Sequence, residues 1–218
     1  MLSEKEIIAK RAAKELKDGY VVNLGIGLPS LLANYLPKGV EITLQAENGI
    51  LGMGSLAAPG DENKDVINAG KQFVTIKKDA CFFDSATSFA IIRGGHVDVT
   101  ALGALEVDEK GTLASHIIPG KMVPGMGGAM DLVSGTKRVI VLTTHTAKGA
   151  PKILKEVRLP KTAVGKVDTI ITELAVIDVT PEGLVLKEIA DNTTIEEVVK
   201  LTEAHLVVPE IVSTFSTT

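Results

Sequence analysis

The sequence predicts an α/β fold: a single domain over residues 1–218 with an open mixed, largely parallel sheet and helices on both faces. Three observations predict it. Helical and strand-like segments alternate, most clearly in the first half of the chain. Several strand-like segments are continuous apolar runs, which are typical of a parallel sheet covered on both faces. No low-complexity linker or internal repeat divides the chain, and its length favours one domain.

In the first half of the chain, the helices are indicated by their end signals. Ser3 and Glu6 match the S-x-x-E capping box, Gly19 stands where that helix is expected to end, and Pro29 suits the first turn of a second helix. The expected helices are 3–19, 29–36 and 84–92. The expected strands are 20–24, 41–46 and 73–76, with a loop over 58–72.

In the second half, β-strands predominate. The expected strands are 97–107, 138–144, 168–173, 175–179 and 184–189, with turns at 108–111 and 181–183. The stretches 97–113 and 175–189 are expected to be antiparallel. Residues 119–128 form an irregular, glycine-rich segment before a short helix over 129–133. A last helix runs to about Ala204 and is capped by Thr193 with Glu196 or by Thr194 with Glu197.

Composition and charge exclude several classes of protein. The net charge is −4, so there is no basic excess to neutralise nucleic-acid phosphates. No apolar run is long enough to span a membrane, and the N-terminus lacks a signal-peptide core. The single cysteine, Cys81, excludes an internal disulfide and is expected to be a small buried hydrophobe. We therefore expect a protein of the reducing cytoplasm.

Glu47 is the sharpest candidate for chemistry. It ends a predicted buried strand, and the carboxyl ends of strands in open α/β sheets face the ligand crevice. Apolar neighbours would partly remove this carboxylate from water and make it a stronger nucleophile. The alternative is that Asn48-Gly49 is simply a hairpin turn and Glu47 is solvated beside it. Against the hairpin, no clean alternating strand follows in residues 50–55, where every second or third residue is glycine.

Two glycine-rich segments are further candidates. Gly25 and Gly27 lie between a strand and a helix, where backbone N–H groups can bind a phosphate, although a tight turn without a ligand fits as well. Gly125, Gly127 and Gly128 precede a helix and could form an oxyanion hole, the alternative being a flexible loop. The four histidines match no metal-ligand spacing, so no metal site is expected.

Three ordered motifs carry a resemblance to a known family. They are residues 22–29 (VNLGIGLP), 47–52 (ENGILG) and 125–131 (GMGGAMD), supported by 93–98 and 172–177. In this order they resemble the B (beta) subunit of class I 3-oxoacid coenzyme A-transferases, and the likeness spans about residues 5–208. The bacterial acetate or butyrate–acetoacetate enzymes are the most similar in their motifs.

The resemblance implies a mechanism and a set of site residues. Glu47 would be the nucleophile that carries CoA as a glutamyl thioester in ping-pong catalysis, and the Gly128 N–H would stabilise the oxyanion. The residues implied to bind substrate or CoA are Asn23, Gly25, Gly27, Asn48, Lys71, Gly127, Ala129 and Met130. For Lys71, contact with a CoA phosphate, contact with the substrate carboxylate and a plain surface position all stay open. No permanently bound cofactor is implied, because CoA is a substrate.

The resemblance also implies a partner and leaves the substrate open. An A (alpha) subunit is expected, in a heterotetramer or larger complex. Acetate or butyrate is the expected acid, with succinyl-CoA or 3-oxoadipate transfer as the alternative. Two other classes compete with this hypothesis: a sugar-phosphate isomerase, and a non-enzymatic sugar-phosphate-type sensor. The first would need a base–acid pair with a phosphate clamp and the second a DNA-reading helix-turn-helix, and neither pattern is found.

Overall fold

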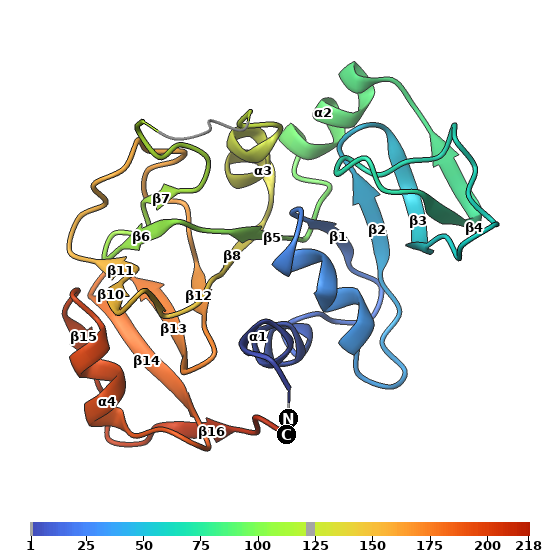
Figure 1. The fold of residues 1–218 in the computed structure, drawn as a ribbon. Helices are drawn as coiled ribbons and strands as arrows, with labels where there is room; N and C mark the ends of the chain where they lie inside the picture. Colours follow the sequence, from blue (N-terminus) through green and yellow to red (C-terminus); the bar gives the residue numbers. More distant parts are fainter. Residues whose placement is uncertain (1, 121–124) are drawn as a thin grey trace.

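The computed structural model describes residues 2–120 and 125–218. In these ranges, eleven strands form one mixed sheet with the order β15-β14-β13-β12-β8-β5-β1-β2-β3-β4, and β16 also pairs with β14 (Figure 1). Its five central strands run parallel to one another. They are β12 (Thr169–Ile171), β8 (Arg138–Leu142), β5 (Val99–Gly103), β1 (Val21–Leu24) and β2 (Thr43–Ala46). The expected open, largely parallel sheet is therefore confirmed.

Antiparallel strands flank this parallel centre on both sides. Beyond β2 lie β3 (Ile50–Leu56) and β4 (Val74–Phe82), and beyond β12 lie β13 (Ala175–Thr180) and β14 (Gly183–Ala190). The short strands β15 (Leu206–Val207) and β16 (Ser213–Phe215) pair parallel to β14. Two small sheets stand apart. One contains β6 (Glu106–Asp108), β7 (Leu113–Ala114) and β11 (Ile153–Leu154), and the other contains β9 (Thr146–Ala147) and β10 (Ala150–Pro151).

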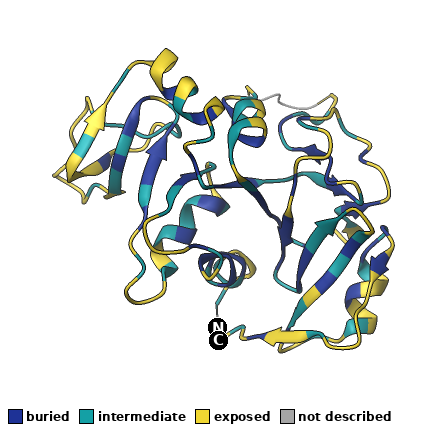
Figure 2. Cartoon of the chain, turned by 180° about the vertical axis from the view of Figure 1, so that it is seen from behind, coloured by how far each residue is buried: buried dark blue, intermediate teal, exposed yellow. Residues whose placement is uncertain are grey.

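Helices cover both faces of the sheet, and β8 shows why. Val139 and Val141 pack in one core cluster, whereas Ile140 and Leu142 pack in another, because successive side chains of a strand point to opposite faces. The first cluster includes residues of α2 (Ser85–Arg93), α3 (Ala129–Gly135) and α4 (Ile195–Leu201). The second includes residues of α1 (Glu4–Ala13) and the 3₁₀ helix η1 (Leu28–Tyr35). Figure 2 shows the central strands buried between these layers.

The helix signals are confirmed at their starts more than at their ends. Ser3 and Glu6 form the capping box of α1, and Thr194 caps α4 by accepting the Glu197 N–H. However, α1 ends at Ala13, because the backbone continues in tighter turns with bonds such as Glu15 N–H to Ala12 O. The helix expected after Pro29 is a 3₁₀ helix.

Several strand predictions are wrong in informative ways. Residues 50–56 do form a strand, β3, although its glycines interrupt the alternation. The strand expected over 73–76 continues to Phe82, because β4 is an edge strand whose Lys77, Lys78 and Asp79 stay in water. Cys81 lies on this exposed strand and is not buried. Of the stretch 97–113, only β6 and β7 are antiparallel, since β5 belongs to the parallel centre.

The two ends of the chain lie side by side next to α1 (Figure 1). Lys10 of α1 donates a hydrogen bond to the carbonyl oxygen of Thr218. None of the helices in the described ranges combines the length and apolar character needed to cross a bilayer.

Candidate functional site

Glu47 lies at the turn between β2 and β3. The turn is a hairpin, as the alternative prediction had it: Ala46 pairs with Ile50, and the Gly49 N–H donates to Ala46 O at 3.0 Å. Gly49 has a φ of +115°, and a Cβ there would lie 2.1 Å from the Phe83 carbonyl oxygen, so only glycine fits. The hairpin does not leave Glu47 solvated. It holds the side chain half-buried at the carboxyl end of the parallel strand β2.

The carboxylate of Glu47 contacts the glycine segment that begins α3. The Gly128 N–H donates to Glu47 Oε1 at 3.1 Å. A Cβ on Gly128 would lie 2.4 Å from Glu47 Oε2, and a Cβ on Gly127 would lie 3.2 Å from Oε1. The absence of side chains at both glycines is therefore what lets the carboxylate approach the backbone. Two motifs 81 residues apart in sequence meet at this point.

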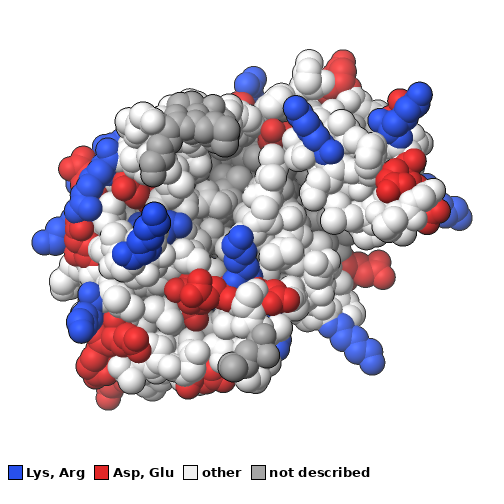
Figure 3. Space-filling model, viewed as in Figure 1, with Lys and Arg blue, Asp and Glu red and all other residues white. Residues whose placement is uncertain are grey.

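A cavity of about 870 Å³ opens beside this contact. Its walls come from β1, η1, β2, β3, the segment 68–77 and the glycine segment. Apolar side chains such as Met53, Leu102 and Leu132 form much of the lining, and in the described part of the chain Lys77 is the only cationic residue on it. Figure 3 shows this face of the molecule hollowed near its centre, with lysines and arginines scattered over its surface. The cavity can hold a small acyl group and part of a longer substrate away from water.

The structure brings six of the expected site residues onto this cavity and leaves four outside its lining. Those on the cavity are Asn23, Gly25, Glu47, Gly127, Gly128 and Ala129. Outside it, the Asn48 amide donates to the Ile67 carbonyl oxygen at 2.7 Å. Gly27 begins η1 with a φ of +85°, Lys71 is exposed with a φ of +61°, and Met130 is 51% exposed.

Sequence reasoning missed three polar residues close to the site. Gln45 is 1% exposed, lines the cavity and lies two residues before Glu47. Its Nε2 donates to Ser88 Oγ of α2 at 3.0 Å. Lys77 also lines the cavity, and its Nζ donates to the Ile42 carbonyl oxygen at 2.8 Å. An amide inside an apolar strand was the available signal for Gln45. Lys77 gave none, because its strand was not expected to reach that far.

A second group of buried polar side chains lies away from the cavity. His145 is fully buried, with its ring nitrogens 3.0 and 2.9 Å from the hydroxyls of Thr172 and Thr202. Burial lowers the pKa of His145 to about 4, raises the pKa of Glu173 and lowers the pKa of Lys152. None of these residues is part of the described cavity lining. We interpret them as a structural network, because the hydroxyl groups of Thr172 and Thr202 provide hydrogen-bond partners for both ring nitrogens of the neutral His145.

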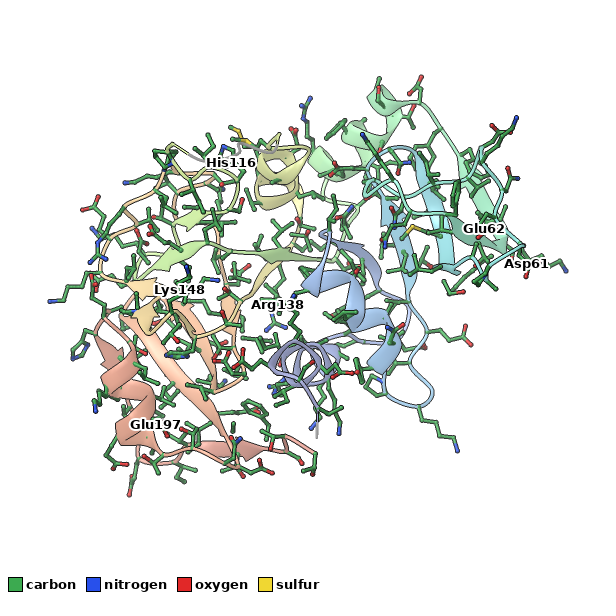
Figure 4. The ribbon with its side chains drawn as sticks, in the orientation of Figure 1. Asp61, Glu62, His116, Arg138, Lys148 and Glu197 are labelled. Atoms are coloured by element: carbon green, nitrogen blue, oxygen red, sulfur yellow. The ribbon has the colours of Figure 1, made fainter. Side chains whose placement is uncertain are left out.

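The charged residues labelled in Figure 4 lie far from a common centre. Asp61 and Glu62 lie at the outer end of the β3–β4 region, and Arg138 lies beside α1, where it pairs with Glu15 at 2.7 Å. His116 lies near α3, and its Nδ1 is 3.0 Å from Thr162 Oγ1. Within residues 2–120 and 125–218, no group of three or more His, Cys, Asp or Glu side chains is placed to hold a metal ion.

Comparison with known proteins agrees with the fold and the motifs. The family model described as "Coenzyme A transferase" matches residues 5–201. The chain is 53% identical to the beta subunit of the acetate CoA-transferase of Haemophilus influenzae, over 96% of this chain and 94% of that protein. It is 50% identical to the B subunit of a probable succinyl-CoA:3-ketoacid coenzyme A transferase of Bacillus subtilis, over 97% of this chain and 99% of that protein.

Solved structures show the same fold in a longer chain. An acyl-CoA transferase apoenzyme of Escherichia coli O157:H7 superposes with a TM-score of 0.77 at 24% identity. The match covers 99% of this chain and 44% of that one, so this chain spans less than half of that protein. The family match and the identities near one half over almost the whole chain show that this protein belongs to the coenzyme A transferase family.

Proposed function

We propose that this chain is the catalytic B subunit of a CoA-transferase that moves CoA between acetoacetyl-CoA or a short-chain acyl-CoA and acetate or butyrate. Glu47 is its nucleophile. The observation that carries the proposal is the 3.1 Å contact between the Gly128 N–H and Glu47 Oε1 at the wall of an 870 Å³ cavity. It combines a nucleophile, a donor for the oxyanion and room for a substrate.

The first half-reaction transfers CoA to the enzyme. A Glu47 carboxylate oxygen attacks the thioester carbonyl, the C–S bond breaks, and CoA leaves as a thiolate from an acyl-glutamyl anhydride. The thiolate then attacks Cδ of Glu47, which releases the first acid as a carboxylate and leaves a glutamyl–CoA thioester. The second acid reverses these steps with its own carboxylate. Both attacking groups are anions, so no general base is required.

The Gly128 N–H is placed to act when Cδ of Glu47 becomes tetrahedral. Negative charge then builds on the Glu47 oxygen that this N–H already contacts. A backbone donor is held by the fold and needs no reorganisation during the step, and removing such a donor typically costs about 2.7–4 kcal/mol in the barrier. The apolar lining of the cavity excludes water, which would otherwise hydrolyse the anhydride.

The charge of the cavity supports a monocarboxylic acid as substrate. In the described lining, the one cation is Lys77, and its Nζ is already bonded to the Ile42 carbonyl oxygen. A second carboxylate, as in succinate or 3-oxoadipate, could pair only with the N–H groups that this one lysine still has, and away from Lys77 it would be buried without a cationic partner, which is costly. Acetate and butyrate place no such charge in the cavity. The alternative remains a succinyl-CoA or 3-oxoadipate enzyme whose partner protein supplies the cation.

The names and lengths of relatives support an A (alpha) subunit as partner. Two relatives that match this chain over almost their full length are named as a beta and a B subunit. We propose that the partner completes the active site in a heterotetramer or larger assembly. We also propose a cytoplasmic location and no permanently bound cofactor, since the chemistry uses CoA only as a substrate.

The test is CoA exchange by the complex of this chain with its A subunit. Acetoacetyl-CoA plus acetate should yield acetyl-CoA, and Glu47→Gln should abolish turnover while the complex still assembles and binds CoA. The glutamine side chain has nearly the same shape as that of glutamate, and its oxygen can still accept a hydrogen bond, but an amide is a poor nucleophile. Retained turnover by Glu47→Gln would reject the assignment. Exchange with succinate but not with acetate would reject the substrate class and keep the chemistry.

A further inference from the structure

Three buried side chains form a continuous hydrogen-bond chain below the cavity. Asn23 of β1 donates through Nδ2 to Gln45 Oε1 at 2.6 Å and to the Gln45 carbonyl oxygen at 3.1 Å. Gln45 of β2 in turn donates through Nε2 to Ser88 Oγ of α2 at 3.0 Å. The three residues are 4%, 1% and 0% exposed. The chain therefore ties two central strands to a helix on one face of the sheet.

The sheet register explains why these residues meet. Asn23 and Gln45 are direct partners in the parallel pairing of β1 with β2, so their side chains share a face. Gln45 lies two residues before Glu47, and Ser88 precedes Phe89, whose ring would lie 3.1 Å from a Cβ on Gly128. The hydrogen-bond chain thus lies directly under the elements that hold the Glu47–Gly128 contact.

The chain has a fixed polarity. The Gln45 carbonyl oxygen can only accept, so Asn23 must direct Nδ2 towards it; the Gln45 side chain then accepts from Asn23 through Oε1 and directs Nε2 to Ser88. The two hydrogens of Asn23 Nδ2 are directed to Gln45, while Asn23 itself lines the cavity. In residues 2–120 and 125–218, no protein donor reaches Asn23 Oδ1. We therefore infer that Asn23 Oδ1 is available to the cavity as a hydrogen-bond acceptor with a defined orientation.

The chemistry of the substrates decides what this acceptor can bind. An ionised acid such as acetate or butyrate has no hydrogen-bond donor, and neither does an acetoacetyl group in its keto form. The pantetheine arm of CoA, which lies next to the sulfur, carries amide N–H groups. An acceptor in the cavity that Glu47 also lines therefore matches the thioester arm and not the acid.

We propose that Gln45 and Ser88 are positioning residues that hold the Asn23 amide with Oδ1 towards the cavity, where it accepts an amide N–H of the pantetheine arm. This inference rests on the proposed function and names the part of the substrate that the polar chain recognises. Without Ser88, the Gln45 side chain is no longer held against Asn23 Nδ2. The Asn23 amide then keeps only its 3.1 Å bond to the Gln45 carbonyl oxygen and holds Oδ1 towards the cavity less firmly.

Ping-pong kinetics separate this role from a general effect on Glu47. The value of kcat/KM for acyl-CoA reports the free-energy difference between the free enzyme with unbound acyl-CoA and the transition state. It therefore includes the full contribution of any contact with the pantetheine arm. The value of kcat/KM for the acid starts from the glutamyl–CoA thioester, in which the arm is already bound. Asn23→Leu, Gln45→Leu and Ser88→Ala should lower the first value about five- to tenfold, which is the loss of one neutral hydrogen bond, and change the second less than about twofold.

The matched control is Ser85→Ala, the same substitution at an exposed position of α2, which should leave both values unchanged. A second test needs no variant. Acetoacetyl-CoA analogues with one pantetheine amide replaced by an ester lack one N–H each. With the unmodified complex, kcat/KM for one of these analogues should be about five- to tenfold lower than for acetoacetyl-CoA. With Asn23→Leu, acetoacetyl-CoA and that analogue should have the same kcat/KM.

The outcomes are distinguishable. An equal fall in both kcat/KM values, or full activity of the unmodified complex with every ester analogue, overturns the inference while the proposed function stands. Absence of CoA exchange by the unmodified complex rejects the proposed function itself. If Gln45→Leu does not fold, Ser88→Ala and the ester analogues decide the question.

Discussion

Gly128→Ala tests the geometry of the proposed active site with a single methyl group. The added Cβ would lie 2.4 Å from Glu47 Oε2 and 2.9 Å from Cδ, so the carboxylate must move away from the backbone N–H. The backbone itself tolerates alanine, since Gly128 has φ −83° and ψ 9°. The variant should fold normally and displace the Glu47 carboxylate, with a smaller adjustment of the Phe89 ring, which would lie 3.1 Å from the new Cβ.

The expected loss follows from the contact that is broken. Losing one oxyanion donor costs about 2.7–4 kcal/mol, which corresponds to a fall in kcat of about 10²- to 10³-fold. The assay is CoA exchange from acetoacetyl-CoA to acetate by the two-protein complex, with Tm measured on the same preparations. The control is Gly103→Ala at the end of β5, where a Cβ meets nothing within 4 Å and φ is not positive.

The reasoning is refuted if Gly128→Ala keeps a kcat within a few-fold of the unmodified enzyme. It also fails if Gly103→Ala loses as much activity, because the effect would then not depend on the Glu47 contact. A large fall in Tm for Gly128→Ala would contradict the statement that its backbone accepts a side chain.

Three further predictions concern stability. Burial lowers the pKa of His145 from its ordinary value of 6.5 to about 4, so between pH 6.5 and pH 4 the unfolded chain binds more protons than the folded chain. The free energy of unfolding should therefore fall by up to about 3 kcal/mol as the pH drops from 6.5 to 4, and denaturant titrations of His145→Gln should lack this contribution. Gly49→Ala should destabilise the fold by at least about 1–3 kcal/mol in the same assay, since its Cβ would clash with the Phe83 carbonyl oxygen at a φ of +115°; a neutral effect would contradict the turn geometry. Arg11→Met should cost about 3 kcal/mol, because Arg11 is 6% exposed and bonds Glu188 at 2.6 Å; an unchanged denaturation midpoint would show that this pair contributes nothing.

The parts of the fold that the sequence predicts well are those that local patterns determine. The capping box at Ser3 and Glu6 depends on residues three apart, and the apolar runs of the central strands need no partner to be recognised. The position of Glu47 at a strand end follows in the same way. Its half-burial does not, because it depends on the glycines at 127–128.

What could not be predicted depends on partners distant in sequence. The edge strand β4 carries charged residues because one of its sides has no neighbour, and a local pattern indicates a loop for such a segment. Gln45 is a polar residue in a strand that becomes interpretable only when Ser88, 43 residues later, is seen to accept its hydrogen bond. The roles of the polar residues that orient the site therefore cannot be predicted from a single sequence.

The central claim is that Glu47 becomes covalently bonded to CoA, and mass spectrometry tests it most directly. The complex with the A subunit is mixed with acetoacetyl-CoA, the thioester is reduced with borohydride, and the digested chain is mapped. We predict irreversible loss of activity that requires acyl-CoA, with the mass change on the peptide that contains Glu47. Inactivation that ignores acyl-CoA, or a modification on any other peptide, would contradict the account.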